Sequence, residues 1–123
     1  MILETIKLFD SELKVMEVIW QKEPITAKDV SILLQGSIGW NKNTTYTILK
    51  KLVDKKIIMR GEPDFVCTSL VKKSEVQSAE TNNLIEKFYN GSKKMFFATF
   101  LQNEKLSKEE VEFLKGLIDK NDQ

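Results

Sequence analysis

The side chains best suited to chemistry gather between residues 42 and 60, and they are amides, hydroxyls and cations. The charged members of this stretch are Lys42, Lys50, Lys51, Lys55, Lys56 and Arg60 on the positive side and Asp54 on the negative side. Cationic and polar side chains bind phosphate oxygens and contact the edges of bases. The net charge of the whole chain is only +1, but phosphate neutralisation depends on local charge. The stretch therefore predicts a nucleic-acid interface.

A helix from Lys42 to about Lys55 is predicted to display these groups. With a turn of about 100° per residue, its apolar side collects Thr45, Ile48, Leu49, Leu52 and Val53. Asn41 is expected to cap this helix by accepting a hydrogen bond from the backbone N–H of Asn43 or Thr44. The first turns would then enter a major groove.

Eight residues are predicted to contact DNA. We expect Asn43, Tyr46, Thr47 and Lys50 near bases, and Lys42, Thr44, Lys51 and Arg60 on phosphates. The alternative is an ordinary amphipathic surface helix whose lysines are solvated, with Arg60 as a solvated hairpin charge. Either interpretation requires a compact domain that buries the apolar side of the helix.

The composition argues against catalysis and against metal binding. The chain has no histidine, so the usual general base and transition-metal ligand are missing. It also lacks a Gly-x-Ser-x-Gly elbow, a glycine-rich phosphate loop and a paired-carboxylate signature. We expect no enzymatic activity, no catalytic residues, no cofactor and no metal site. The single Cys67 excludes an internal disulfide and is expected to be a small packed residue rather than a redox switch.

The size and hydropathy of the chain predict a globular, cytoplasmic protein. Of its 123 residues, 41% are hydrophobic and 30% are charged. No apolar run approaches the roughly 20 residues that span a bilayer, and the N-terminus lacks the pattern of a signal peptide. We expect no association with membranes.

The order of predicted elements in the first 71 residues is that of a winged helix-turn-helix. Asp10 is expected to cap a helix that runs to about Gln21, and a capping box at 26–29 opens a short helix through Leu34. A turn is expected at 36–39, before the helix that begins at Lys42. The period then changes to two across 57–70, with Gly and Pro between the halves, which predicts a β-hairpin. The expected fold is mainly α with a small β wing, and residues 1–71 form a DNA-binding domain.

Residues 72–123 are predicted to form a helical dimerisation domain. Helices are expected from Ser74 to a stop at Gly91, from Ser92 to about Gln102, and from Ser107 onward. This region is too short to enclose its own apolar surface, so two copies would bury it together. The expected contacts between copies are Leu84, Ile85, Phe88, Phe96, Phe97, Phe100, Leu101, Leu114 and Leu117. The alternatives are packing back onto residues 1–71 and an aromatic small-molecule pocket.

Four stretches carry a resemblance to a known family, namely Ser11–Trp20, Trp40–Thr44, Leu49–Ile58 and Leu106–Glu110. They make nearly the whole chain similar to the penicillinase and methicillin-resistance repressors of the BlaI and MecI type. The resemblance implies a homodimeric winged-helix repressor that binds a palindromic double-stranded DNA operator and blocks transcription of β-lactam resistance genes. It also implies a protease linked to a membrane sensor of β-lactams.

The resemblance places the cleavage bond of the family at Thr99–Phe100, where this sequence has threonine in place of asparagine. Lys42 stands where the family has proline, Lys56 stands where it has glycine, and the wing is shorter. The cysteine pair of copper-responsive relatives is missing, which argues against that branch. Two alternative functions remain: a winged-helix protein-interaction adaptor, and a DNA-binding repressor that responds to a different signal.

Overall fold

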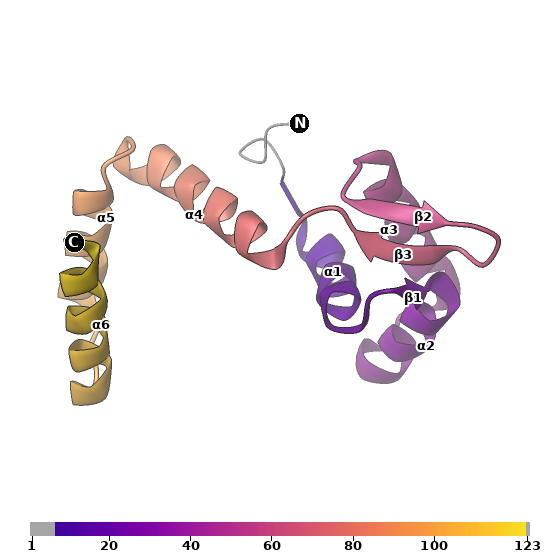
Figure 1. Ribbon diagram of the computed structural model, residues 1–123, viewed down its shortest axis with the longest axis horizontal. Coiled ribbons are helices and arrows are strands. Elements are labelled where there is room, and N and C mark those ends of the chain that lie inside the picture. The colour runs from indigo at the N-terminus through magenta and orange to yellow at the C-terminus, as the bar shows by residue number, and fades with distance from the viewer. Residues whose placement is uncertain (1–6, 123) are drawn as a thin grey trace. The chain divides into compact units, whose positions relative to one another are not determined.

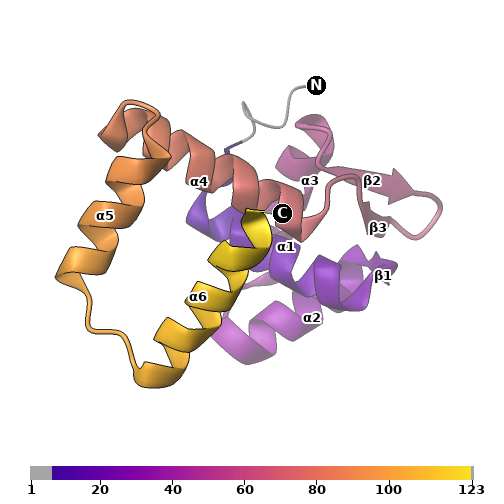
Figure 2. The same ribbon diagram turned by 60° about the vertical axis from the view of Figure 1, so that its left-hand side comes forward.

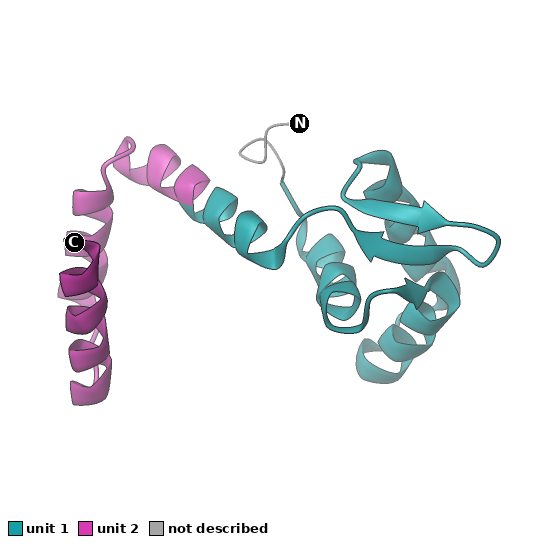
Figure 3. Ribbon diagram, in the orientation of Figure 1, with its two compact units in different colours: residues 1–81 teal, residues 82–123 magenta. Residues whose placement is uncertain are grey.

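The computed structural model describes residues 7–122, and it is mainly helical with a small antiparallel sheet (Figure 1). Its elements are α1 (Asp10–Lys22), β1 (Ile25–Thr26), α2 (Ala27–Ile38), α3 (Lys42–Asp54), β2 (Ile58–Gly61), β3 (Val66–Ser69), α4 (Lys73–Tyr89), α5 (Lys93–Asn103) and α6 (Lys108–Asn121). The predicted fold class is confirmed. The chain divides into two compact units, Met1–Thr81 and Asn82–Gln123, with the boundary inside α4 (Figure 3).

The first unit has a single apolar core between three helices and a three-stranded sheet. Figure 2 shows α1, α2 and α3 grouped together, with the turn of the β2–β3 hairpin pointing away from them. The core is formed by Val15, Met16, Ile19, Ile25, Ala27, Val30, Leu34, Ile48, Leu49, Leu52, Ile57, Ile58, Phe65 and Cys67. Every element of the winged helix contributes to this list, so α3 and the hairpin are held against the same interior.

The sheet has one strand more than the predicted hairpin. Its strand order is β1-β3-β2, and β1 pairs with β3 through Ile25 opposite Cys67 and Thr26 opposite Val66. A strand of two residues has no alternation to detect, so the sequence predicted no strand between the first two helices. The pairing closes the edge of β3 that the hairpin alone would leave open.

The ends of the first two helices differ from the predictions. Asp10 was expected to be the cap of α1, but Phe9 holds that position and its N–H donates to Glu12 Oε1 at 2.9 Å. The second helix was expected to end at Leu34, and it continues to Ile38 with Gly36 inside it. Gly39 provides the stop in the left-handed conformation at φ +75°, because glycine adopts that region at little cost.

The end of α3 forms a Schellman motif around Lys56. The N–H of Ile57 donates to the carbonyl of Leu52 at 3.0 Å, and the N–H of Lys56 donates to Val53 at 3.0 Å. Lys56 is left-handed at φ +62°, a conformation that costs a lysine more free energy than the glycine of the family. The turn redirects the chain at once into β2, which places the hairpin beside α3.

The helices of the C-terminal region begin largely at the expected residues. Ser92 Oγ accepts from Met95 N at 3.1 Å, and Ser107 forms a capping box with Glu110. The hydrogen bonds from the backbone and side chain of Ser107 lower the pKa of the Glu110 carboxyl. The predicted cap at Ser74 is wrong: α4 begins at Lys73, and the N–H of Lys72 donates to Glu75 Oε1 at 2.9 Å. Within residues 7–122, no helix combines the length and the hydropathy needed to cross a bilayer.

Lys56→Gly is expected to raise the free energy of unfolding by about 0.5 to 1 kcal/mol, because glycine removes the strain of the left-handed backbone. Urea unfolding monitored by circular dichroism measures the change. The matched control is Lys14→Gly, an exposed lysine inside α1, which should lose about 1 kcal/mol. Equal losses in both variants would contradict the role assigned to the turn.

The thiol of Cys67 is expected to be almost unreactive at pH 8 in the folded protein. Cys67 is fully buried, and burial raises its pKa from 9.0 to about 11, with the Arg60 charge partly opposing the shift. The thiolate is the reactive form, so disulfide exchange with Ellman's reagent should be at least about a hundredfold slower than in the urea-unfolded chain. Equal rates would contradict this prediction.

The sign of the pH dependence follows from the direction of the same shift. A folded pKa above the unfolded one means that the stabilising contribution of the neutral thiol is complete below about pH 9 and is lost toward pH 11. Cys67→Ala should remove that component, which is read as the difference between the two pH profiles of unfolding free energy.

Candidate nucleic-acid interface

The orientation of α3 is set by its cap and by its buried side. Asn41 Oδ1 accepts from Thr44 N at 2.8 Å, which is one of the two capping bonds that the sequence predicted. The buried residues of α3 are Thr45, Ile48, Leu49 and Leu52. All four belong to the predicted apolar side, and the partly buried Val53 packs against the same core. The opposite side of α3 therefore faces solvent.

Most of the predicted DNA-binding residues lie on that solvent side. The exposed members are Lys42, Asn43, Thr44, Thr47, Lys50 and Lys51. Within residues 7–122, no salt bridge involves Lys42, Lys50 or Lys51. Uncompensated ammonium groups along one helix face attract phosphate.

The outward groups near the start of α3 are partly ordered by neighbours on the same helix. Thr47 Oγ1 donates to the carbonyl of Asn43 at 2.8 Å, so these two residues share one stripe. The ammonium of Lys42 lies 5.5 Å from the centre of the Tyr46 ring, within the range of a cation–π contact. The positive end of the helix dipole and the cations thus occupy the same region.

Tyr46 differs from its neighbours because it is only partly exposed. It was predicted to point away from the apolar side, but its ring packs against the core and meets the Phe65 ring edge-on with centroids 6.0 Å apart. Phe65 is buried in the turn of the hairpin and is left-handed at φ +53°. The contact links the first turns of α3 to the wing.

Arg60 lies on β2, and its guanidinium stacks on the same Phe65 ring. The distance from Cζ to the ring centre is 3.8 Å, and Nε donates to the Glu62 carboxylate. The Arg60 side chain remains 39% exposed. The Phe65 ring therefore contacts both Tyr46 and Arg60, so one aromatic ring positions both side chains. Sequence reasoning did not single out Phe65, although an aromatic residue beside a Pro-Asp turn was a signal for it.

Lys55 belongs to the basic stretch but is used inside the protein. Its Nζ lies 2.8 Å from Glu12 Oε1, and the Glu12 side chain is only 3% exposed. The same ammonium lies 4.9 Å from the centre of the Phe9 ring. A buried carboxylate needs a close partner, so this pair ties the end of α3 to the start of α1. The positive charge that residues 42–60 offer to a ligand is therefore smaller than their number of lysines and arginines suggests.

The second unit exposes most of the residues predicted to contact another copy. Those with large exposed side chains are Leu84, Phe88, Phe97, Phe100, Leu101 and Leu117. Phe96 and Leu114 are half-buried, and the Phe96 ring meets Tyr89 edge-on and lies tilted against Phe97 and Phe100. Ile85 is different because it is only 5% exposed within the single chain. Met95, Phe113 and Ile118, which the predicted set of contacts does not include, are also exposed.

The bond between Thr99 and Phe100 lies inside α5, where the carbonyl of Thr99 accepts from Asn103 Nδ2 at 2.9 Å. Thr99 is half-buried and Phe100 is exposed. The described residues of α5 include none that is fully buried. Few buried contacts therefore hold this helix in place.

The comparisons with known proteins agree with this geometry. The penicillinase repressor family matches residues 8–120. The chain is 29% identical over 119 residues to the methicillin resistance regulatory protein MecI of Staphylococcus epidermidis, covering 95% of this chain and 97% of that one. It is 28% identical over 117 residues to the penicillinase repressor of Bacillus licheniformis, covering 94% and 91%. The solution structure of the DNA-binding domain of the repressor BlaI matches with a TM-score of 0.52 at 30% identity, covering 56% of this chain and 87% of that domain.

These matches confirm the resemblance that the four sequence stretches indicated. The match to the BlaI domain supports the winged-helix interpretation of α1 to β3. The family match extends beyond that domain through almost all of α6. The chain belongs to the penicillinase repressor family.

Proposed function

We propose that this chain is a homodimeric transcriptional repressor that inserts α3 into the major groove of a palindromic operator and controls β-lactam resistance genes. The observation that carries the proposal is the outer face of α3, where exposed amides, hydroxyls and uncompensated lysines stand on a helix whose other face is buried. Membership of the penicillinase repressor family and the similarity to a methicillin resistance regulatory protein support the choice of target genes.

The geometry supports a division of labour along α3. Asn43, Thr47 and Lys50 are spaced by four and three residues, so they form one stripe that can follow base edges. Tyr46, partly held by Phe65, is proposed to contact bases at the edge of this stripe. The proposed phosphate contacts are Lys42, Thr44, Lys51 and Arg60.

The wing contact is proposed to depend on Phe65. The ring fixes the Arg60 guanidinium at 3.8 Å while leaving the side chain 39% exposed. Holding a long cationic side chain in one place reduces the entropy lost when it binds phosphate. Lys55 is not assigned to DNA, because its partner Glu12 is only 3% exposed and needs the ammonium inside the protein. The partner of Arg60, Glu62, is 61% exposed, so water can replace Arg60 beside it when Arg60 turns to phosphate.

Lys51→Ala is expected to weaken binding to random duplex DNA and to reduce the slope of log affinity against log salt by about 1. Fluorescence anisotropy titrations at several salt concentrations measure both quantities. Lys14→Ala is the matched control, because Lys14 is also exposed but lies on α1. Lys50→Ala is expected to cost about 1 to 3 kcal/mol at one base position of a duplex selected from a random pool.

An unchanged affinity and salt slope in both Lys50→Ala and Lys51→Ala would show that α3 is not the reading helix. No salt-sensitive binding by the unmodified chain would instead favour a protein-interaction adaptor with the same fold.

The second unit is proposed to pair with a second copy of itself. Phe88 and Phe113 are each 68% exposed, and several other large apolar side chains accompany them. Large apolar side chains exposed in such number are costly in water and are a common sign of a protein interface. Ile85 is already buried within one chain, so we assign it to packing inside the subunit.

Phe88→Asp and Phe113→Asp are expected to shift the protein from dimer to monomer at micromolar concentration, because a carboxylate would have to be buried in the interface. Sedimentation equilibrium measures the shift, and far-ultraviolet circular dichroism checks that the helices persist. Lys105→Glu, at an exposed position between α5 and α6, is the control and should remain dimeric. A monomeric wild-type protein would contradict the proposed dimer.

Relief of repression is proposed to occur by cleavage between Thr99 and Phe100. A protease requires an extended segment, so α5 must open locally before the bond can be cut. Because no described residue of α5 is fully buried, the free energy of opening this helix is expected to be low. A protease linked to a membrane sensor of β-lactams is the proposed agent.

A further inference from the structure

The connection between the wing and α4 is short and contacts α1 at several points. β3 ends at Ser69 and α4 begins at Lys73, so only residues 70–72 separate them. α4 then continues without interruption to Tyr89, crossing the boundary between the two compact units at Thr81. Whatever holds residues 69–73 therefore determines where α4 begins relative to the winged helix.

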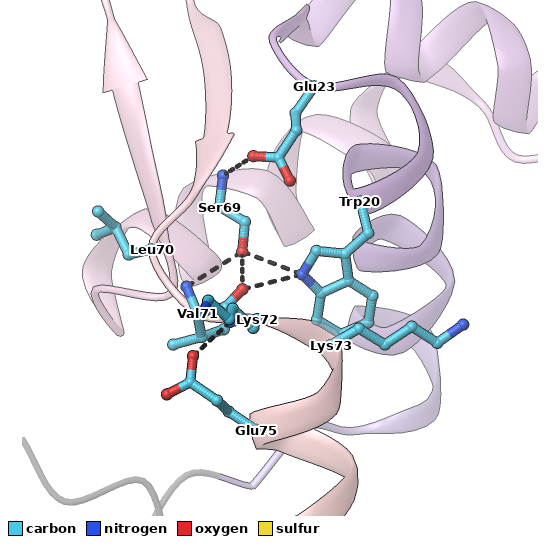
Figure 4. A pocket seen from close by; sticks show the side chains of 8 residues that line it. All are labelled: Trp20, Glu23, Ser69, Leu70, Val71, Lys72, Lys73 and Glu75. Atoms are coloured by element: carbon cyan, nitrogen blue, oxygen red, sulfur yellow. Dashed lines mark hydrogen bonds between the residues drawn. The ribbon is translucent and has the colours of Figure 1, made fainter.

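Trp20, on the last turn of α1, holds this connection through its indole N–H (Figure 4). Nε1 donates to Ser69 Oγ at 3.1 Å and to the carbonyl of Val71 at 3.1 Å. The Ser69 hydroxyl also donates a hydrogen bond to the carbonyl of Val71, and it accepts one from the N–H of Val71 at 3.2 Å. The indole N–H of Trp20 thus completes a small hydrogen-bond network that holds both Ser69 and Val71.

Other contacts from the same helix region support the network on both sides. Glu23 Oε1 accepts from the N–H of Ser69 at 2.8 Å, before the connection. Lys73 Nζ lies 3.0 Å from Glu17 Oε2, after it. Val76 is buried and lines a groove together with Trp20, so the first turns of α4 pack beside α1.

We propose that Trp20 is a positioning residue for binding at two half-sites, because its indole N–H fixes the direction in which α4 leaves the reading unit. The inference rests on the proposed homodimeric function. Linking two binding units increases affinity only when the connection lets both engage at once, so the gain is sensitive to the geometry of the link. If the first residues of α4 were held less firmly, each reading unit would still bind one half-site. The gain in affinity from binding two half-sites at once would be smaller.

Trp20→Phe tests the donor itself, because phenylalanine keeps an aromatic ring but has no N–H. Hydrogen exchange should show faster exchange of the backbone amides at 70–79 and unchanged protection in α3. Trp40→Phe is the matched control: its indole makes no hydrogen bond within residues 7–122, and it packs against the same core. It should leave the amides at 70–79 unchanged.

The DNA test uses a palindromic duplex that the wild-type chain selects from a random pool, a duplex with one half of it, and a duplex with two base pairs inserted between the halves. Trp20→Phe should bind the single half as the wild type does. Its affinity for the full palindrome should fall by about tenfold or more, and it should discriminate less against the inserted spacer. Ser69→Ala, which removes the hydroxyl but keeps the indole, should shift the same quantities in the same direction.

The outcomes separate two kinds of failure. If Trp20→Phe and Ser69→Ala retain the full preference of the wild type for the uninterrupted palindrome, the positioning role is overturned. A uniform rise in exchange throughout the first unit would also overturn it, since that result indicates a general packing role. If the wild-type chain itself shows no preference for two halves over one, the proposed homodimeric function fails.

Discussion

Burial of one side of α3 is the constraint on which the rest of the first unit depends. Ile48, Leu49 and Leu52 lie in the core with residues from α1, α2 and the hairpin. Burying a single large aliphatic side chain contributes about 1.5 to 3 kcal/mol, whereas a surface contact between helix neighbours contributes about 0.2 to 0.5 kcal/mol. The core therefore decides which way α3 faces, and its lysines are turned to solvent as a consequence rather than through contacts of their own.

Charge in this region is divided between structure and surface in a way that a count of lysines does not reveal. Lys55 forms a salt bridge with Glu12, 43 residues away in sequence. Arg60 pairs with Glu62 and stacks on the Phe65 ring. Lys50 and Lys51 are exposed and form no salt bridge within residues 7–122. Because phosphate binding depends on charge that is accessible, the proposed interface is narrower than the basic stretch of the sequence.

Local signals in the sequence predicted the parts of the fold that local physics determines. The cap at Asn41, the buried side of α3 and the hairpin after Lys56 all follow from spacing and residue type. The strand β1 could not be found this way, because its two residues are defined only by pairing with β3. The half-burial of Tyr46 escaped prediction for the same reason: it depends on Phe65, which arrives from the hairpin.

The two units differ in how far a single chain buries their large apolar side chains. The first unit buries large aliphatic side chains such as Met16, Ile19 and Leu49 in a core within one chain. The second unit leaves Phe88, Phe113 and Ile118 exposed. In the proposed dimer, the free energy of burying these side chains is gained only on association, so the stability of the second unit rises with protein concentration. If Phe97 and Phe100 contact the second copy as proposed, opening of α5 and separation of the two copies would break the same contacts. A single cut in that helix would weaken the dimer and, with it, two-site binding to DNA.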